Sequence, residues 1–345
     1  KLSEDLSRRD FTINAMAYSE AEGLIDIFGG KEDLQNGLIR SVGESRKRFA
    51  EDALRILRAV RLSSVLDFKI ETKTSHAMVE LAHTLSYPSA ERKCSEFTKL
   101  LVGSGAAEAL RENQEVLFAL VPELCPTVSC TQETPNHFLN VFEHTLLALE
   151  AAPKILTVRL AVLFHDIGKP RCKSFDFTGS AHFYGHAATS AKMAAEILNR
   201  FRFEKKIVKR VCELVIHHDD ALPFSPTHIK RLLATMGDTA FLELLEVKKS
   251  DIYGQNPAFF NLQRPFFAEA FSNYERIKKE HQCFSLSQLA ITGDDLLQLG
   301  FTKDRRLGEA LHTLLMAVID GELPNQKKAL LYRAEILKAK KTSDH

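Results

Sequence analysis

The chain has 345 residues, 45% hydrophobic and 26% charged, a composition typical of globular proteins and long enough for about two to four domains. Its formal net charge of +1 excludes a global basic field, so any nucleic-acid binding must come from local patches. Six cysteines without a CxxC pair argue against a zinc ribbon or a disulfide framework and indicate a reducing cytoplasm. No apolar run reaches the about 18 residues that a membrane span needs.

Residues 1–44 predict a piece of a mixed α/β domain. Two short strands, at 15–18 and 24–28, are separated by a polar turn, and a third strand is predicted at 38–42. The segment is too small to bury a core alone. It also begins on a dense polar cluster, so we expect the natural sequence to continue upstream of Lys1.

From about residue 45 the hydrophobic period is helical. The run FAEDALRILRAVRLSSVL (49–66) predicts one amphipathic helix, with an apolar stripe that begins at Ala50. Ser89 is predicted to cap a later helix that ends near Gly103. Further helices are predicted beyond a loop rich in Thr, Cys, Pro and Asn at 126–136, which we interpret as a linker.

The stretch RRDFTIN contains Arg8, Arg9 and Asp10 just before a predicted helix start. Arginines and free backbone N–H groups at such a position favour phosphate. The alternative is a surface ion pair between Arg9 and a nearby carboxylate.

A second polar group follows in EDALRILRAVR, where Asp52, Arg55, Arg58 and Arg61 repeat at intervals of three residues. Each step turns a side chain by about 60° around a helix, so the four residues predict a winding strip. One interpretation is an exposed helix face with salt bridges. In the other, the aspartate and an arginine contact the Watson–Crick edge of a base and the remaining arginines contact a triphosphate.

The runs RRDFTINAMAY, GLIDIFGGKEDLQNGLIRSVG, RFAEDALRILRAVR and AERKCSEFTKLL resemble, in order and spacing, bacterial CCA-adding tRNA nucleotidyltransferases and their poly(A) polymerase relatives. The C-terminal runs ITGDDLLQLG and RRLGEALHTLLMAVIDGELPNQKKALL resemble the tail of members that carry an HD domain. One departure is Ile27, where the family usually has proline, and we expect only a local loop change there.

The resemblance implies roles for the residues of both polar groups. Arg9 is expected to contact the triphosphate, and Asp52 with Arg55 to select CTP and then ATP as a protein template. Arg58 and Arg61 are expected to steady the nucleotide and its phosphates. The implied partners are tRNA, CTP and ATP, with no DNA and no membrane.

The resemblance also implies a catalytic Asp-x-Asp that holds Mg²⁺ for nucleotidyl transfer. No Asp-x-Asp occurs in the 345 residues. We therefore expect this polypeptide alone to add no nucleotides, although the complete protein would.

Histidines and aspartates in FEHTLLALE, FHDIGKP, GHAATSAKM, VIHHDD and KKSDIYGQ resemble the HD metal-dependent phosphohydrolases, which use imidazoles and carboxylates to bind divalent metals. The alternative is that they are buried structural residues on helices that persist as a scaffold. By resemblance, a first metal site contains His144, His165, Asp166 and Asp251, a possible second one adds His186 and His217, and Lys169 would meet a phosphate.

The predicted fold is mainly α, in four parts: a remnant of an α/β nucleotidyltransferase head (1–44), a helical neck and body (45–136), an HD domain (137–260) and a helical tail (261–345). The leading function is CCA addition to tRNA. The alternatives are a poly(A) polymerase or A-adding enzyme, an HD phosphodiesterase or phosphatase, and a non-catalytic RNA-binding fragment. Basic clusters of the second half, such as Lys248–Lys249, are candidate RNA contacts.

Overall fold

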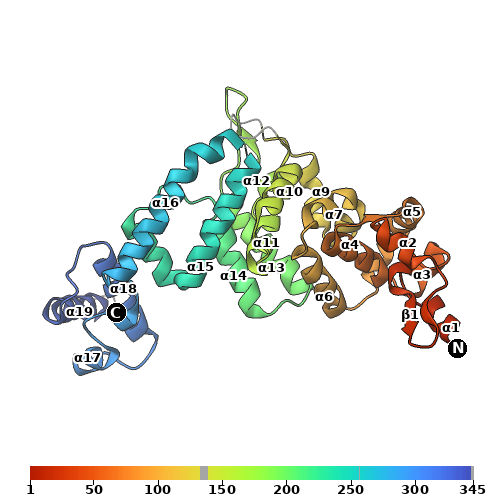
Figure 1. Ribbon diagram of the computed structural model, residues 1–345. Helices are drawn as coiled ribbons and strands as arrows, with labels where there is room; N and C mark the ends of the chain where they lie inside the picture. The colour runs from red at the N-terminus through yellow and green to blue at the C-terminus, as the bar shows by residue number, and fades with distance from the viewer. Residues whose placement is uncertain (133–138, 256, 343–345) are drawn as a thin grey trace. The chain divides into compact units, whose positions relative to one another are not determined.

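The computed structural model describes residues 1–132, 139–255 and 257–342 (Figure 1). The predicted boundary between 136 and 137 and the last four residues of the predicted linker, 133–136, lie outside the described residues. The described parts are helical with a few short strands, which confirms the predicted mainly α fold class. Two compact units are present: Lys1–Asp219 with Glu243–Asn261, and Asp220–Leu242 with Leu262–His345.

The N-terminal segment contains the predicted hairpin and a shorter third strand than predicted. Strands β1 and β2 pair antiparallel, with Met16 opposite Asp26, and β3 pairs in parallel with β4. The elements are α1 (Leu2–Ser7), a 3₁₀ turn η1 (Thr12–Asn14), β1 (Met16–Ser19), β2 (Gly23–Asp26), α2 (Gly30–Gln35), β3 (Leu38–Ile39) and β4 (Lys69–Ile70).

The single helix predicted over 49–66 is two helices, α3 (Ser45–Glu51) and α4 (Leu54–Leu66). The backbone at Asp52 is extended, and its carboxylate accepts a hydrogen bond from the backbone N–H of Leu54 at 3.1 Å. An aspartate at this position satisfies a donor at the start of the second helix and so favours the break. The break also exposes Ala50, which the predicted stripe placed in the core.

The helical body continues with α6 (Ala90–Leu101), and Ser89 caps it as predicted. Beyond it, the break at Asn113 again divides one apolar run into two helices. The remaining elements of this part are α5 (Thr72–Leu81), η2 (Ala82–Ser86), α7 (Ala106–Glu112), α8 (Gln114–Leu120), η3 (Pro122–Leu124) and α9 (Cys125–Val128).

The histidine-rich segment is a group of packed helices with one small hairpin. Helix α13 packs against α14, and α11 packs against both α10 and α14. The elements are α10 (Val141–Ala151), α11 (Leu156–Phe164), α12 (Lys169–Cys172), β5 (Ser174–Phe175), β6 (Ala181–His182), α13 (His186–Arg200) and α14 (Lys205–His217). The hairpin β5–β6 was not among the predicted elements, because each strand has only two residues.

The second unit has its own apolar core. Leu296, Leu314 and Leu330 are fully buried there, on three different helices. Helix α15 (Pro226–Gln255) contains a break at Gly237 (φ 80°), and its residues from Glu243 belong to the first unit. The other elements are α16 (Pro257–Lys279), η4 (Leu286–Gln288), α17 (Gly293–Gln298), α18 (Arg305–Ile319) and α19 (Lys327–Thr342).

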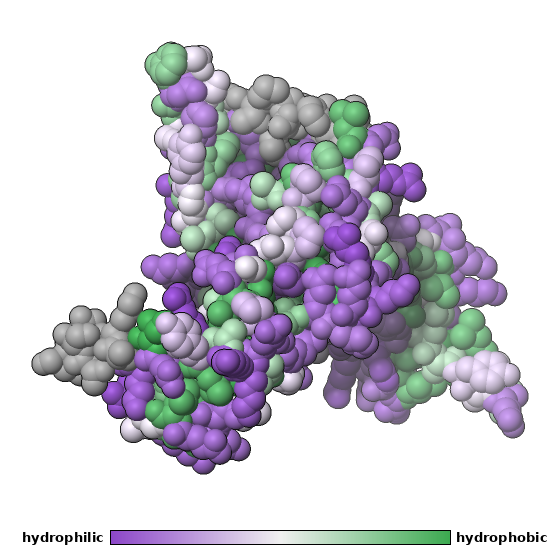
Figure 2. All heavy atoms as spheres, turned by 90° about the vertical axis from the view of Figure 1, so that its left-hand side faces the viewer, coloured by the Kyte–Doolittle hydropathy of each residue, from purple (hydrophilic) through white to green (hydrophobic). Residues whose placement is uncertain are grey.

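The face in Figure 2 is mostly hydrophilic, with apolar residues exposed in small groups. Among the described residues, no helix combines the length and the apolar character that crossing a bilayer requires.

Candidate nucleotide and metal sites

A polar pocket of about 570 Å³ lies between the N-terminal segment and the helical body. Five arginines face two aspartates there, so positive charge is in excess, as a polyphosphate requires. The lining residues are Arg8, Arg9, Asp10, Asn14, Asp52, Arg55, Arg58 and Arg92.

Asp52 is held in the break between α3 and α4 with its side chain about one third exposed. Its second carboxylate oxygen accepts a hydrogen bond from Arg92 Nη2 at 2.6 Å. Burial raises the pKa of this carboxyl, but the bonds from Arg92 and from the Leu54 N–H outweigh it and lower the pKa. At neutral pH, Asp52 is therefore an ionised acceptor among the residues that line the pocket.

The guanidinium of Arg55 is fixed in position by three acceptors. Nη1 donates to the carbonyl of Arg48 at 2.9 Å and to Glu51 at 2.6 Å, and Nη2 donates to the carbonyl of Arg8 at 3.2 Å. An arginine held in this way is preorganised, so little side-chain entropy is lost when a ligand binds.

Arg58 and Arg9 reach the same pocket with different degrees of constraint. Arg58 pairs with the buried Asp10 at 2.6 Å. Arg9 pairs with Asp5 at 2.9 Å, and both side chains are more than half exposed. The two interpretations of Arg9 are therefore compatible, because an exposed ion pair contributes little and leaves the cation available to an anion.

Arg61, which the resemblance implies as a nucleotide contact, is not among the residues that line this pocket. It pairs with the nearly buried Glu96 of α6 at 2.8 Å. Six residues after Arg55, the helix has rotated the side chain by about 120° away from the pocket strip. Arg92 was missed instead; the only sequence signal for it is the Ser89 cap, which places Arg92 in the first turn of α6.

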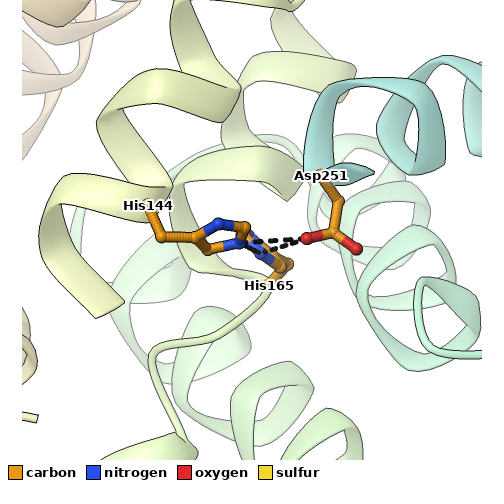
Figure 3. A group of neighbouring side chains, drawn as sticks. All are labelled: His144, His165 and Asp251. Atoms are coloured by element: carbon orange, nitrogen blue, oxygen red, sulfur yellow. Dashed lines mark hydrogen bonds and ion pairs between the residues drawn. The ribbon is translucent and has the colours of Figure 1, made fainter. Parts of the chain in front are cut away.

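Three predicted metal ligands converge in the histidine-rich segment (Figure 3). Asp251 Oδ1 lies 3.0 Å from His144 Nε2 and 3.4 Å from His165 Nε2, and the two imidazole nitrogens are 3.1 Å apart. These side chains come from α15, α10 and the end of α11. Ligand atoms this close together offer one common coordination position.

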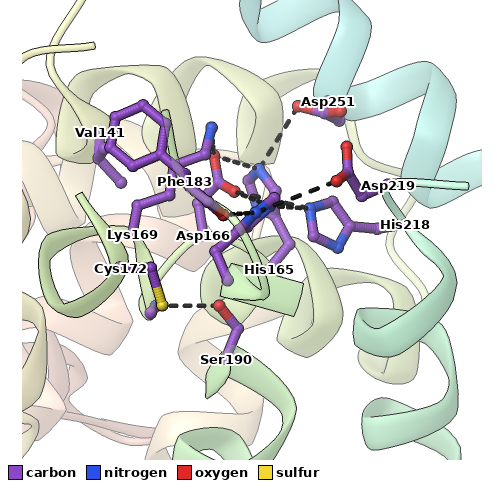
Figure 4. Close-up of polar contacts among 12 residues, drawn as sticks. Val141, His165, Asp166, Lys169, Cys172, Phe183, Ser190, His218, Asp219 and Asp251 are labelled. Atoms are coloured by element: carbon purple, nitrogen blue, oxygen red, sulfur yellow. Dashed lines mark hydrogen bonds and ion pairs between the residues drawn. The ribbon is translucent and has the colours of Figure 1, made fainter. Parts of the chain in front are cut away.

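The carboxylate of Asp166 lies between two groups of histidines (Figure 4). Its Oδ2 is 3.2 Å from His165 Nε2 and 3.6 Å from His144 Nε2. Its Oδ1 is 3.4 Å from His186 Nε2 and 3.5 Å from His218 Nε2. Asp166 is 1% exposed, so an ionised form there requires these neighbours.

The structure places His218, rather than His217, in this cluster. His217 is the last residue of α14, and His218 follows it with its ring directed to Asp166. Successive residues on a helix point about 100° apart, so only one of two adjacent histidines can face the same centre.

Three of the rings are oriented by hydrogen bonds on the side away from the cluster. The Nδ1 atoms of His165, His186 and His218 lie 2.6, 2.9 and 2.6 Å from backbone carbonyl oxygens. A ring whose Nδ1–H donates to a carbonyl turns its Nε2 toward the cluster, which is the arrangement usual for metal-binding histidines.

Burial lowers the pKa of His165, but the carboxylates of Asp166 and Asp251 outweigh it and raise the pKa to about 10. Burial raises the pKa of Asp166, and the cations of His165 and Lys169 reverse this, so its pKa lies well below the ordinary value. Lys169 Nζ is 2.6 Å from Asp166 Oδ2 and donates to Gln132 at 2.8 Å.

Two glycines allow the elements of the cluster to approach. A Cβ on Gly254 would lie 2.8 Å from the carbonyl oxygen of His144, so this glycine lets α15 contact α10 closely. A Cβ on Gly168 would lie 2.8 Å from the backbone nitrogen of Ser190 on α13. Both contacts are shorter than a side chain tolerates, so the glycines set the distances between the ligand-bearing elements.

The donor chemistry of this cluster fits a divalent metal. The cluster offers imidazole nitrogens together with carboxylate oxygens, a mixture of ligand atoms that suits divalent metal ions. The arginine pocket does not fit the Mg²⁺ pair of nucleotidyl transfer, because its two carboxylates, Asp10 and Asp52, are both engaged by arginines.

The arginine pocket offers the excess of positive charge that a nucleotide polyphosphate needs. Three family models match the chain: the poly A polymerase head domain over residues 1–40, the probable RNA and SrmB-binding site of polymerase A over 67–125, and the putative tRNA nucleotidyltransferase domain 2 over 181–334. The histidine cluster spans part of the last region and the segment before it.

Whole-chain comparisons agree with these matches. The chain is 33% identical to the CC-adding tRNA nucleotidyltransferase of Thermus thermophilus, over 96% of this chain and 77% of the relative. It is 32% identical to the A-adding tRNA nucleotidyltransferase of Deinococcus radiodurans, over 96% and 79%. The crystal structure of the Bacillus stearothermophilus CCA-adding enzyme in complex with CTP superposes with a TM-score of 0.66 and 26% identity, over 100% of this chain and 76% of that one. The chain belongs to the family of CCA-adding tRNA nucleotidyltransferases and poly(A) polymerases.

Proposed function

We propose that the chain supplies the nucleotide-selecting part of an enzyme that transfers CMP and AMP from CTP and ATP to the 3′ end of tRNA and releases pyrophosphate. The observation that carries this proposal is the arginine-rich pocket with Asp52 held between Leu54 and Arg92. The names of the relatives support it, since they are CC-adding, A-adding and CCA-adding enzymes.

Selection of these two nucleotides follows from the chemistry of one acceptor and one donor. Cytosine and adenine both carry an exocyclic amine, whereas uracil and guanine present a carbonyl at the equivalent position. The ionised Asp52 accepts from the amine and repels the carbonyl, and the fixed guanidinium of Arg55 donates to the adjacent ring atoms. Arg9 and Arg58 are then left for the phosphates.

Transfer itself needs carboxylates for two metal ions, and the 345 residues contain no Asp-x-Asp. We therefore expect this polypeptide to bind CTP and ATP without transferring them. The deciding assay is incorporation of labelled CTP and ATP into a tRNA that lacks its CCA end. The assay compares this polypeptide with a version that is extended by an N-terminal segment carrying Asp-x-Asp.

The products of the extended protein distinguish the alternatives. Incorporation of CC, of A alone, or of CCA identifies the addition step, and long A tracts identify a poly(A) polymerase. Turnover by the 345 residues alone would contradict the proposed division of roles.

A second proposed activity is metal-dependent phosphohydrolysis at the histidine cluster. The supporting observation is that Asp166 faces two groups of oriented imidazoles while Lys169 lies beside it. A divalent ion bound by His144, His165, Asp166 and Asp251 would polarise a phosphoryl oxygen and activate water. Lys169 would hold the negative charge of the substrate.

This activity is tested with p-nitrophenyl phosphate and nucleotide phosphodiesters in the presence of Ni²⁺ or Mn²⁺. Hydrolysis by the wild type and its loss in Asp166→Ala support the proposal. Equal hydrolysis by both proteins would show that the activity comes from a contaminant or another site. We also place the protein in a reducing cytoplasm, which its six free cysteines suit.

A further inference from the structure

Lys248 is a buried cation next to the histidine cluster. Lys248 lies on α15 and is only 5% exposed. Its Nζ donates a hydrogen bond to the backbone carbonyl of His218 at 2.5 Å. The adjacent Lys249 is exposed by 41% and pairs with Glu246 at 2.6 Å. In the sequence these two adjacent lysines form one basic cluster. In the structure only Lys249 of the pair is exposed to solvent.

Burial of an ammonium is costly unless the group is well paired. One acceptor of Lys248, the carbonyl of His218, lies just past the C-terminus of α14, where the last helical carbonyls carry partial negative charge and have no partner within the helix. Lys248 therefore closes the end of the helix that presents His218. The ring of His218 is fixed separately, by the contact of its Nδ1 with the carbonyl of Val215 at 2.6 Å.

The spacing on α15 connects this contact to the rest of the cluster. Lys248 and Asp251 are three residues apart, so they lie on the same face of the helix. Asp251 contacts His144 and His165, whereas Lys248 contacts the backbone of His218. One turn of α15 thus touches both groups of histidines that surround Asp166.

We propose that Lys248 is a positioning residue that holds His218 and thereby sets the affinity of a second metal position, formed by His186, His218 and Asp166. The first position, formed by His144, His165, Asp166 and Asp251, does not depend on this contact. The inference rests on the proposed metal centre.

The charge of Lys248 and its positioning role predict opposite changes in metal affinity when the lysine is replaced. An ammonium close to a bound cation repels it, so removal of the charge alone would tighten metal binding. Loss of an orienting contact weakens binding, typically by about 10–100-fold. The direction of the change in affinity therefore separates the two roles.

The test measures Mn²⁺ binding to the full 345-residue chain by calorimetry and electron paramagnetic resonance. Two ions with a spin-coupled signal are expected for the wild type. Lys248→Met, which keeps the length of the side chain without a donor, should raise the dissociation constant of the second ion by about 10–100-fold and leave the uncoupled signal of the first. His218→Ala should give the same signature.

Lys249→Met is the matched control and should bind both ions as the wild type does. Lys248→Gln keeps an N–H donor and should restore part of the second-ion affinity, which a general loss of packing would not allow. Retained binding of the first ion shows that each variant is folded.

Unchanged or tighter binding of the second ion by Lys248→Met would overturn the inference while leaving the metal centre in place. Loss of both ions to the same degree would also overturn it, since Lys248 would then be merely structural. A wild type that binds no Mn²⁺ would remove the metal centre and the inference together.

Discussion

At the scale of single residues, arginines that lie close together on one helix have different surroundings. Arg58 and Arg61 lie one turn apart on α4, and each pairs with a nearly buried carboxylate, Asp10 and Glu96 respectively. Only Arg58 also lines the pocket. Two chemically equal side chains thus have different expected roles because of the direction in which the helix presents them.

This difference is tested with Arg58→Met and Arg61→Met. Each substitution leaves a carboxylate without its arginine, so both should lower the free energy of unfolding by roughly 1–3 kcal/mol. Only Arg58→Met should weaken the binding of CTP and ATP, by about tenfold or more, as expected for the loss of a charged hydrogen bond. Equilibrium nucleotide binding and chemical denaturation measure the two effects. Equal loss of nucleotide binding in both variants would contradict the assignment.

Asp52 gives a second residue-scale prediction. Asp52→Ala removes the acceptor for an exocyclic amine, so discrimination of CTP and ATP against UTP and GTP should fall by about tenfold. Competition binding with the four nucleotides measures it. Glu80→Ala, which removes a carboxylate paired with Arg46 outside this pocket, serves as the control. Preserved discrimination in Asp52→Ala would place selection elsewhere.

At the scale of elements, a buried arginine joins the helical body to the histidine-rich helices. Arg159 of α11 is 3% exposed, and its Nη1 donates to the carbonyls of Leu101 and Gly103, both at 2.6 Å. Its other nitrogens donate to the carbonyls of Ala152 and Pro153 at 3.0 and 3.1 Å. The guanidinium therefore satisfies carbonyls near the ends of α6 and α10 at once.

Arg159→Met should destabilise the first unit by about 3–5 kcal/mol, because several buried carbonyls lose their donor together. Denaturant unfolding measures the change, and Lys192→Met, an exposed substitution on α13, should leave stability within about 0.5 kcal/mol. A small effect of Arg159→Met would mean that water replaces the guanidinium.

The ion pair between Arg200 of α13 and Glu123 of η3 predicts a pH dependence. Two hydrogen bonds of 2.6 and 2.9 Å from Arg200 lower the pKa of Glu123 below its ordinary value of 4.5. Its contribution to stability is therefore complete above pH 4.5 and disappears as the pH falls through the lowered pKa. The difference in unfolding free energy between wild type and Glu123→Gln should be about 0.5–1 kcal/mol at pH 7 and vanish in acid. A difference that grows in acid would contradict the sign.

At the scale of the whole molecule, each compact unit has its own apolar core. Leu57 is fully buried in the first unit and Leu314 in the second. Separate cores predict two unfolding transitions in calorimetry. Leu57→Ala and Leu314→Ala should each lower the temperature of one transition, because each removes about 2–5 kcal/mol from the unfolding free energy of its own unit. A single transition that both variants lower equally would show that the units unfold together.

The arginine pocket brings together residues that the sequence singles out, because the sequence signals for them are local. Arg9, Asp52, Arg55 and Arg58 come from two short runs with recognisable spacing, and the pocket contains all four. Arg92 could not be predicted, since it lies 40 residues from its partner Asp52. The break at Asp52 was also missed, because helical periodicity continues on both sides of it.

For the histidine cluster, too, the sequence predicts the contributing segments better than the individual residues. Sequence motifs indicate which segments contribute ligands, but they do not distinguish His217 from His218, which are adjacent in the chain. The choice depends on the rotation of the last turn of α14 against Asp166.

The amino-acid order by itself determined the helical class, the caps and the short motifs, because these depend on contacts within one or two turns of the chain. Only the tertiary structure decided which arginine turns to Glu96, which histidine reaches Asp166 and which lysine is buried. Those outcomes depend on how helices pack and rotate against partners that are distant in sequence, and hydrophobic periodicity does not specify that rotation to within one residue.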